Sequence, residues 1–179
     1  MATGVVDPFI IALGELRDTH GARRHELRRG RLNEAVVADL DSRVPAGAEA
    51  VVDVTLEAFD GGVEVSGSVS APWEGECRRC LASLDGGLEA GVRELFRRGG
   101  GEEDGTYPLG EDQINLRDMV VDALFAVLPV LPLCKDDCRG ICPNCGADRN
   151  LETCSCPEVA VDERWAGTRA LVQDDPHGG

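Results

Sequence analysis

Aromatic residues are scarce in this chain, at 4% of 179 residues, while hydrophobic residues of all kinds make up 42%. The aromatic residues are two Trp, one Tyr and four Phe. A buried core must therefore consist mainly of Val, Leu and Ala. A chain of this length is expected to form one domain, to which a small metal-held module could be attached.

Long hydrophobic runs are also missing. The longest apolar stretch, 119–133, has about 15 residues, whereas a membrane-spanning helix needs about 20. This stretch contains Asp122 and is interrupted by Pro129 and Pro132. The N-terminus lacks a basic start, and its apolar stretch Pro8–Leu13 is too short for the core of a signal peptide. We therefore expect a cytoplasmic protein with no membrane partner.

Sequence patterns typical of catalysis are absent. The three histidines, His20, His25 and His177, lie outside every cysteine motif, and there is no His-Glu-x-x-His, Gly-x-Ser-x-Gly or phosphate-binding glycine loop. The acidic run 102–104 could bind magnesium, but its position in a glycine-rich loop favours a solvated charge run. We expect no enzyme and no small-molecule substrate. A nuclease or RNA-modifying enzyme is the alternative.

Positively charged residues are few. The chain has 18 Lys and Arg against 33 Asp and Glu, a net charge of −15, and Lys135 is its only lysine. Such a chain repels nucleic acid over most of its surface, so basic proteins are the more natural partners. Two groups of arginines could still contact RNA phosphates, for which a guanidinium group is well suited: Arg23, Arg24, Arg28, Arg29 and Arg31, and then Arg78 and Arg79. Alternatively, the first group is an ordinary solvated face and the second offsets thiolate charge.

Cysteine, in contrast, is plentiful and regularly spaced. One Cys-x-x-Cys pair precedes a dense group of six, giving Cys77 and Cys80, then Cys134, Cys138, Cys142, Cys145, Cys154 and Cys156. A Cys-x-x-Cys turn holds two thiolates at the separation that tetrahedral zinc requires. Eight thiolates make two four-cysteine sites with none left over. Closed sites of this kind are structural, because a catalytic zinc keeps one position for water.

Other interpretations of the cysteines are less economical. A disulfide framework needs an oxidising compartment, and the Cys154-x-Cys156 pair is awkward to bridge. An iron–sulfur cluster would use only four of the eight cysteines. A redox role for Cys77 and Cys80 is weakened because such motifs usually open a helix, and here the motif comes after a strand-like segment. We therefore predict two structural zinc ions.

The cysteines can be grouped in two ways. In the favoured grouping, Cys77, Cys80, Cys134 and Cys138 share one zinc, and Cys142, Cys145, Cys154 and Cys156 share the other. The first site then ties the middle of the chain to its C-terminal third, and the second is local. In the rival grouping, the local site is formed by 134–145, and Cys77 and Cys80 join Cys154 and Cys156.

Periodicity predicts an α+β fold built on an antiparallel β meander or partial barrel. Apolar residues alternate with polar ones over 52–58 and again over 63–71, and the turn 60–62 between them is typical of a hairpin. A third strand is predicted over 88–96, so that the cysteine pair lies at a turn. Pro72 disfavours a central position in a sheet for the residues after it. A further strand is possible over 8–13 and a helix over 31–40.

One helix is expected after the acidic loop 99–113. Asn115 can cap it, apolar residues recur at helical spacing from Leu116 to Leu128, and Pro129 ends it. We expect it to pack on the sheet and to deliver Cys134. The resulting organisation is a β-rich core domain over 1–130, a zinc module over 131–160 tied to the core through Cys77 and Cys80, and a short helix carrying Trp165 with a disordered tail over 161–179.

The order of these motifs resembles the YceD family of large-subunit ribosomal RNA accumulation proteins in its cysteine-rich form. The resemblance rests on Glu76-Cys-Arg-Arg-Cys-Leu81, on Ile-Asn-Leu-Arg-Asp at 114–118, and on the segment from Leu-Cys134 to Cys-Pro-Asn-Cys-Gly146. It extends over about residues 8–170. It implies a bacterial, cytoplasmic, non-catalytic factor for 23S ribosomal RNA accumulation and ribosome biogenesis.

The partners implied by the resemblance are the pre-ribosomal large subunit, its RNA or a basic ribosomal protein. Residue by residue, only the cysteines match a functional pattern of the family, and no catalytic residue is carried over. A zinc-dependent DNA-binding regulator is a further alternative. Both the acidity of the chain and its lack of a zinc-finger recognition helix weigh against that alternative.

Overall fold

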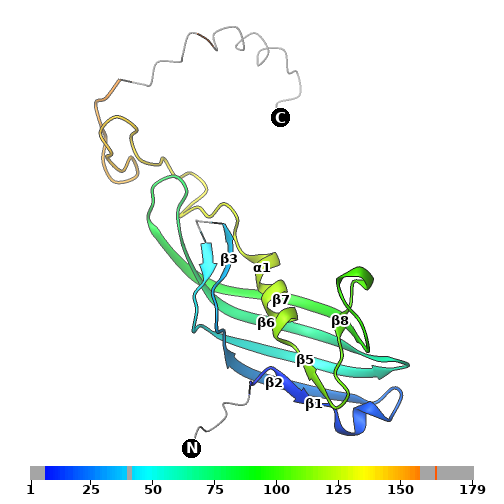
Figure 1. Cartoon of the computed structure of the whole chain (residues 1–179). Coiled ribbons are helices and arrows are strands. Elements are labelled where there is room, and N and C mark those ends of the chain that lie inside the picture. Colours follow the sequence, from blue (N-terminus) through cyan, green and yellow to red (C-terminus); the bar gives the residue numbers. More distant parts are fainter. Residues whose placement is uncertain (1–6, 40–41, 158–163, 165–179) are drawn as a thin grey trace, which may run out of the picture.

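Three long antiparallel strands form the centre of the structure, a computed structural model that describes residues 7–39, 42–157 and 164. These strands are β5 (Glu49–Phe59), β6 (Gly62–Glu76) and β7 (Ser83–Arg97), and they run as a meander (Figure 1). The tight turn at Asp60 and Gly61 joins the first two, with Gly61 at φ 84°. The predicted hairpin and the strands on both sides of it are therefore confirmed.

Shorter strands extend this sheet on both sides. On one edge of β5 lies β2 (Arg23–Arg31), and β4 (Ser42–Val44) pairs with the end of β6 and carries β3 (Val36–Asp39). On the far edge, β8 (Tyr107–Pro108) pairs in parallel with β7. A separate two-stranded sheet joins β1 (Ile10–Ala12) to β9 (Gln113–Asn115). Both sheets are open, so within the described residues the fold is mostly antiparallel and α+β, without closing into a barrel.

The core lies between the sheet and the helix α1 (Arg117–Val127), which crosses the face of the sheet (Figure 1). Side chains on each central strand alternate between buried and exposed, as a half-buried strand requires. The helix contributes Met119, Val120 and Leu124 to the same core, and its flanking residues Leu116 and Leu128 are buried there as well. The N-cap of this helix is Leu116, which makes no side-chain cap bond, so the prediction that Asn115 caps the helix is wrong by one residue. The side chain of Asn115 accepts a hydrogen bond from the Arg117 N–H (3.0 Å) just before the helix. No described helix is long and apolar enough to span a membrane.

Three local predictions need correction. Residues 31–39, the described part of the predicted helix 31–40, do not form a helix, because Val36 to Asp39 pair with β4 instead. The acidic loop contains a short 3-10 helix, η2 (Glu102–Asp104), and the strands β8 and β9 begin within 99–113. Pro72 does not confine the residues after it to an edge, because Glu74 and Gly75 lie between β4 and β7. Pro72 itself comes after the pairing of β6 with β5 has ended, at Ser70, and before its pairing with β4 begins, at Glu74, so it pairs with β7 alone.

The short 3-10 helix η1 (Gly14–Arg17) precedes β2. The predicted helix around Trp165 and the predicted disordered tail lie outside the described residues.

Candidate metal centres

The first cysteine pair lies in the turn between β6 and β7. The backbone N–H of Cys77 donates to the carbonyl of Ala82 (2.8 Å), and the N–H of Leu81 donates to the carbonyl of Cys77 (2.8 Å). Leu81 is the only non-glycine residue in the described part of the chain with a positive φ, at 61°. These bonds close a tight knuckle that brings both thiols to the same end of the hairpin.

A second knuckle repeats this geometry 65 residues later in the chain. The N–H of Cys142 donates to the carbonyl of Ala147 (2.8 Å), and the N–H of Gly146 donates to the carbonyl of Cys142 (2.9 Å). Gly146 has φ 76° and occupies the position equivalent to Leu81. Two separate segments of the chain therefore adopt the same hydrogen-bonded turn around a Cys-x-x-Cys pair.

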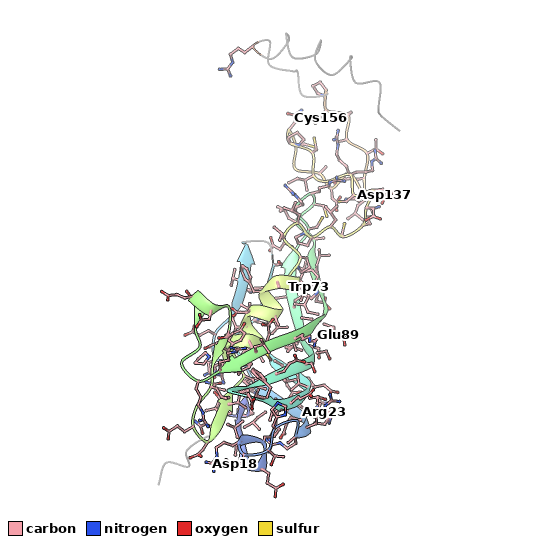
Figure 2. The ribbon with its side chains drawn as sticks, turned by 90° about the vertical axis from the view of Figure 1, so that its right-hand side faces the viewer. Asp18, Arg23, Trp73, Glu89, Asp137 and Cys156 are labelled. Carbon is pink, nitrogen blue, oxygen red and sulfur yellow. The ribbon has the colours of Figure 1, made fainter. Side chains whose placement is uncertain are left out.

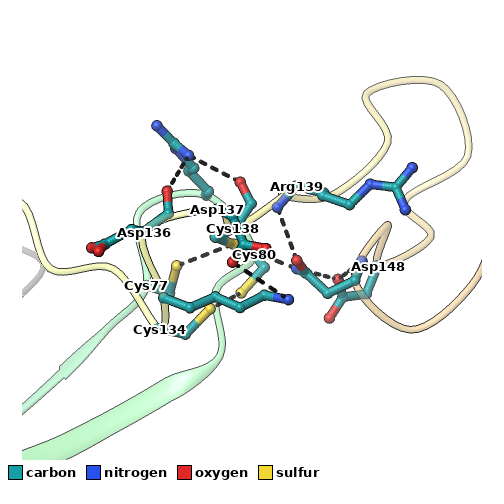
Figure 3. A network of polar contacts seen from close by, with 11 residues as sticks. Cys77, Cys80, Cys134, Asp136, Asp137, Cys138, Arg139 and Asp148 are labelled. Atoms are coloured by element: carbon teal, nitrogen blue, oxygen red, sulfur yellow. Dashed lines mark hydrogen bonds and ion pairs between the residues drawn. The ribbon is translucent and has the colours of Figure 1, made fainter.

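The structure brings the eight cysteines together in the favoured grouping. One cluster consists of Cys77, Cys80, Cys134 and Cys138, the other of Cys142, Cys145, Cys154 and Cys156, and within each cluster all four sulfurs lie within 4.8 Å of one another. Every cysteine is a free thiol. In the first cluster (Figure 3), the Sγ atoms of Cys77 and Cys138 are 3.7 Å apart, and those of Cys80 and Cys134 are 3.6 Å apart.

These separations fit one tetrahedral metal ion per cluster. Bonds of about 2.3 Å from zinc to sulfur require sulfurs about 3.8 Å apart. Disulfides require about 2.05 Å and are not formed. With four sulfur ligands a tetrahedral ion is fully coordinated and has no open position for water or substrate. Each cluster can thus hold a metal ion in a structural role.

Backbone N–H groups favour the thiolate at the first cysteine of each knuckle. Burial raises the pKa of the Cys77 thiol, but hydrogen bonds from the backbone of Cys134, Cys80 and Arg79 outweigh it and bring that pKa to about 6. Hydrogen bonds from the backbone of Cys145 and Asn144 lower the pKa of the Cys142 thiol to about 6. The thiolate that a metal binds is already favoured at these two positions.

Two other thiols in the same clusters have a raised pKa instead. Interaction with Cys138 raises the pKa of Cys134 to about 12, and interaction with Cys145 raises that of Cys156 to about 12. The largest cause is the hydrogen bond with the neighbouring sulfur, which favours the protonated thiol, and burial and repulsion among closely held thiolates add to it. A divalent cation at the centre of each cluster would offset this repulsion.

The first cluster holds distant parts of the chain together. Its knuckle comes directly after β6, and its other two cysteines come from the segment after α1 (Figure 3). The backbone also contributes, because the Arg78 N–H donates to the carbonyl of Pro132 (3.1 Å) and the Ile141 N–H donates to that of Arg79 (3.0 Å). The buried hydroxyl of Ser42 donates to the carbonyl of Pro129 and fixes β4 to the same segment.

The two clusters are linked through Asn150, a residue that sequence reasoning missed. Its side-chain amide donates to the Cys138 sulfur (3.4 Å), and its carbonyl oxygen accepts from the Arg139 N–H (2.8 Å) (Figure 3). Asn150 lies between the cysteines of the second cluster but contacts the first. No cysteine spacing predicts this contact, since it depends on how the two turns pack.

Gly140 permits the close packing of the knuckles. It has φ 69°, and a Cβ atom there would lie 2.9 Å from the carbonyl oxygen of Arg79. The guanidinium of Arg79 donates to the backbone carbonyl of Cys138 (3.0 Å). Both knuckle arginines are exposed, but the guanidinium of Arg79 is bonded to the backbone of the first centre.

The arginines of the first group point to two sides of β2. Arg24 and Arg28 lie on the side of the core and both pair with Glu26, at 2.7 and 2.8 Å. Arg23 and Arg29 lie on the outer face and pair with Glu57 and Glu49. The side chain of Arg31 donates to the carbonyl of Gly47 (3.2 Å).

The two groups of arginines do not form one continuous patch. In Figure 2, Arg23 lies near the end of the sheet marked by Asp18, whereas Asp137 and Cys156 lie beyond the opposite end. Arg78 and Arg79 belong to the knuckle at that opposite end. An RNA molecule that contacts both groups of arginines would have to extend from one end of the sheet to the other.

Comparison with known proteins places this arrangement of an open antiparallel sheet and two four-cysteine clusters in a family. The profile of the family described as "Large ribosomal RNA subunit accumulation protein YceD" matches residues 65–172, a range that contains all eight cysteines. The chain belongs to the YceD family. The family carries a name for a role in the accumulation of large-subunit ribosomal RNA.

Curated relatives come from mycobacteria. A protein of Mycobacterium tuberculosis strain H37Rv is 34% identical over 162 residues, which cover 87% of this chain and 72% of the relative. A protein of Mycobacterium leprae strain TN is 30% identical over 135 residues, covering 72% of this chain and 62% of the relative. Both are named as uncharacterized proteins. No solved structure shows significant similarity to the chain.

Proposed function

We propose that this protein is a non-catalytic factor for the accumulation of large-subunit (23S) ribosomal RNA, acting in the cytoplasm on the pre-ribosomal particle. The observation that carries the proposal is the family match over the part of the chain that contains every cysteine. Two four-sulfur sites without an open position support a structural role for the metal, because chemistry at a metal needs a free coordination position.

The metal in both centres is zinc in this proposal, one ion for each cluster. Zinc accepts four thiolates in a tetrahedral arrangement and has no redox chemistry of its own. The first centre ties a module over 131–160 to a β-rich core over 1–130, and the second gives that module its own shape. A module of about 30 residues is too small to fold on a hydrophobic core alone, so the metal would supply most of its stability.

The direct contact is proposed to be with a basic ribosomal protein, with RNA making a weaker contribution. A net charge of −15 disfavours general RNA binding, and zinc–thiolate centres add further negative charge. RNA contacts would come from the exposed Arg78 and from the outward-facing Arg23, Arg29 and Arg31. Arg24 and Arg28 are only about half as exposed as Arg23 and Arg29 and share Glu26 on the core side, and Arg79 is bonded to the first centre, so these three would contribute less.

The proposal is tested in a bacterium whose own copy of the gene is depleted. Depletion should lower the ratio of 23S to 16S ribosomal RNA, and the wild-type chain should restore it. The tagged chain should co-sediment with large-subunit precursors in a sucrose gradient. A normal RNA ratio after depletion would contradict the proposal, and so would cleavage or modification of ribosomal RNA by the pure protein.

A further inference from the structure

A groove of about 780 Å³ lies beside α1, away from both metal centres. One wall is formed by α1, with Asp118, Val121 and Asp122, and another by the segment 32–36 that leads into β3. The remaining walls come from Glu94 on β7 and from the segment 102–108. Its volume is in the range of sites that hold a small ligand or several side chains of a peptide.

The lining of this groove combines apolar side chains with carboxylates of a single sign. The apolar residues of the lining are Leu32, Ala35, Val36, Pro108 and Val121, of which Ala35 and Pro108 are exposed and Val121 is half-buried. Five carboxylates surround it: Glu34, Glu94, Glu102, Asp118 and Asp122. The one cation in the lining, Arg117, is already bound to Asp7 at 2.7 Å. The groove therefore carries uncompensated negative charge over an apolar surface.

Glu94 is the most informative of these carboxylates. It is half-buried and lies on the core side of β7, in line with Val92 and Phe96. No described residue forms an ion pair or hydrogen bond with it. Glu26, the carboxylate on the core side of β2, is in contrast paired with two arginines. A half-buried carboxylate is costly without a partner, so its accessibility from the groove points to a cation supplied from outside.

The side chain of Tyr107 interacts with several of the groove carboxylates. Its hydroxyl donates to Asp122 (2.8 Å), and its ring stacks on Phe96 at 5.0 Å. Burial, the hydrogen bond to Asp122 and the nearby charges of Glu94 and Asp118 all raise the pKa of Tyr107. Three carboxylates from two elements, α1 and β7, therefore interact with one half-buried side chain of the groove lining.

The arrangement of these carboxylates favours a long cation over a metal ion. Within the described residues, only the two cysteine clusters have three or more ligand atoms within 4.8 Å of one another. No three of the groove carboxylates are close enough to share one metal ion. Nucleic acid is disfavoured by the sign of the charge. The apolar lining suits a chain that alternates cationic and apolar side chains, which a polypeptide offers and a simple polyamine does not.

We propose that this groove binds an extended arginine- or lysine-rich segment of a partner protein. The inference rests on the proposed function, since it names the surface through which a basic protein would be held. A cationic side chain pairs with Glu94 and Asp118, and apolar neighbours of that side chain pack on Pro108 and Val121. Complementary charge sets both the attraction and the direction from which the partner approaches.

The test uses the full zinc-loaded chain and a fluorescein-labelled peptide that alternates Arg with Leu, with fluorescence anisotropy as the measurement. The variant Glu94→Gln with Asp118→Asn removes two groove carboxylates that have no internal hydrogen-bond or ion-pair partner in the described part of the chain. Its matched control is Glu89→Gln with Asp60→Asn, two exposed carboxylates outside the groove. Both double variants change the net charge equally. We expect about a tenfold loss of affinity for the groove variant and less than about twofold for the control.

A second variant tests the shape of the groove. Ala35 is exposed on its wall, so Ala35→Arg should fold normally and place a competing cation inside. We expect it to abolish peptide binding although every carboxylate is still present. Equal losses in the groove and control variants, or competition by spermidine as effective as that by unlabelled peptide, would overturn the proposal. Because this assay does not measure ribosomal RNA, its failure would leave the proposed role in RNA accumulation to be decided by depletion.

Discussion

At the scale of single residues, Leu81 stands out because its backbone conformation is unfavourable. A left-handed conformation costs a non-glycine residue about 1–2 kcal/mol. The equivalent position of the second knuckle is Gly146, which adopts the same conformation without this cost. The Leu81 side chain is 58% exposed, so packing in the core does not compensate for the strain.

Exchanging these residues should therefore have opposite effects. Leu81→Gly should raise the free energy of unfolding by about 0.5–1 kcal/mol, because relief of strain exceeds the entropy that glycine adds to the unfolded chain. Gly146→Leu should lower it by about 1–2 kcal/mol, although a Cβ there meets nothing within 4 Å. Urea unfolding of the zinc-loaded proteins measures both. A loss of stability in both variants would show that Leu81 makes a contact that outweighs its strain.

The sequence predicted some side-chain positions better than others. Alternation identified the buried residues of β5 and β6 because one face of each strand packs on a core and the other meets solvent. The same rule does not assign the arginines of β2, where charged residues occupy both faces. In the structure, Arg24 and Arg28 lie on the core side of β2 because both form ion pairs with Glu26 there. Such pairing depends on tertiary packing and has no local sequence signal.

At the scale of elements, the first metal centre joins a hairpin to the end of a helix. Cys80 and Cys134 are 54 residues apart in the chain, and their sulfurs are 3.6 Å apart. Closing a loop of this length restricts the unfolded chain strongly, by about 4 kcal/mol for a full cross-link. The second centre closes only the short loop between Cys142 and Cys156. The two centres should therefore contribute differently to stability.

This difference is tested with two matched substitutions. Cys80→Ser should destabilise the sheet as well as the module, by up to about 4 kcal/mol, and Cys154→Ser should chiefly loosen residues 142–156. Hydrogen exchange locates each effect, with the amides of β6 and β7 as the reporter of the sheet. If both variants lost protection in the same amides and released both metal ions, the assignment of cysteines to separate centres would be wrong.

Prediction of whole elements succeeded where the pattern was long and failed where it was short. The helix α1 and the meander of β5, β6 and β7 were predicted because their periodicity extends over several turns or residue pairs. Residues 31–40 suggested a helix but contain Val36 and Val37, which pair with β4 in the structure. That pairing is settled by the position of β4 beside β6, which the local sequence does not reveal.

At the scale of the whole molecule, charge and metal act together. The chain has a net charge of −15, and each four-thiolate zinc centre would add about two further negative charges. The grouping of cysteines was inferred from their spacing and is reproduced in space. The groove beside α1 was not predicted, since its carboxylates come from four separate segments of the chain.

Zinc binding by both cysteine clusters underlies the proposed architecture, and native mass spectrometry of the purified chain tests it. We expect a mass corresponding to the polypeptide with two zinc ions, because each cluster supplies four sulfurs at tetrahedral separation. Acid should release both ions and return the mass to that of the polypeptide alone, since metal binding requires thiolates. A chain that carries no metal, a single zinc ion, or iron would contradict the assignment of one zinc ion to each cluster.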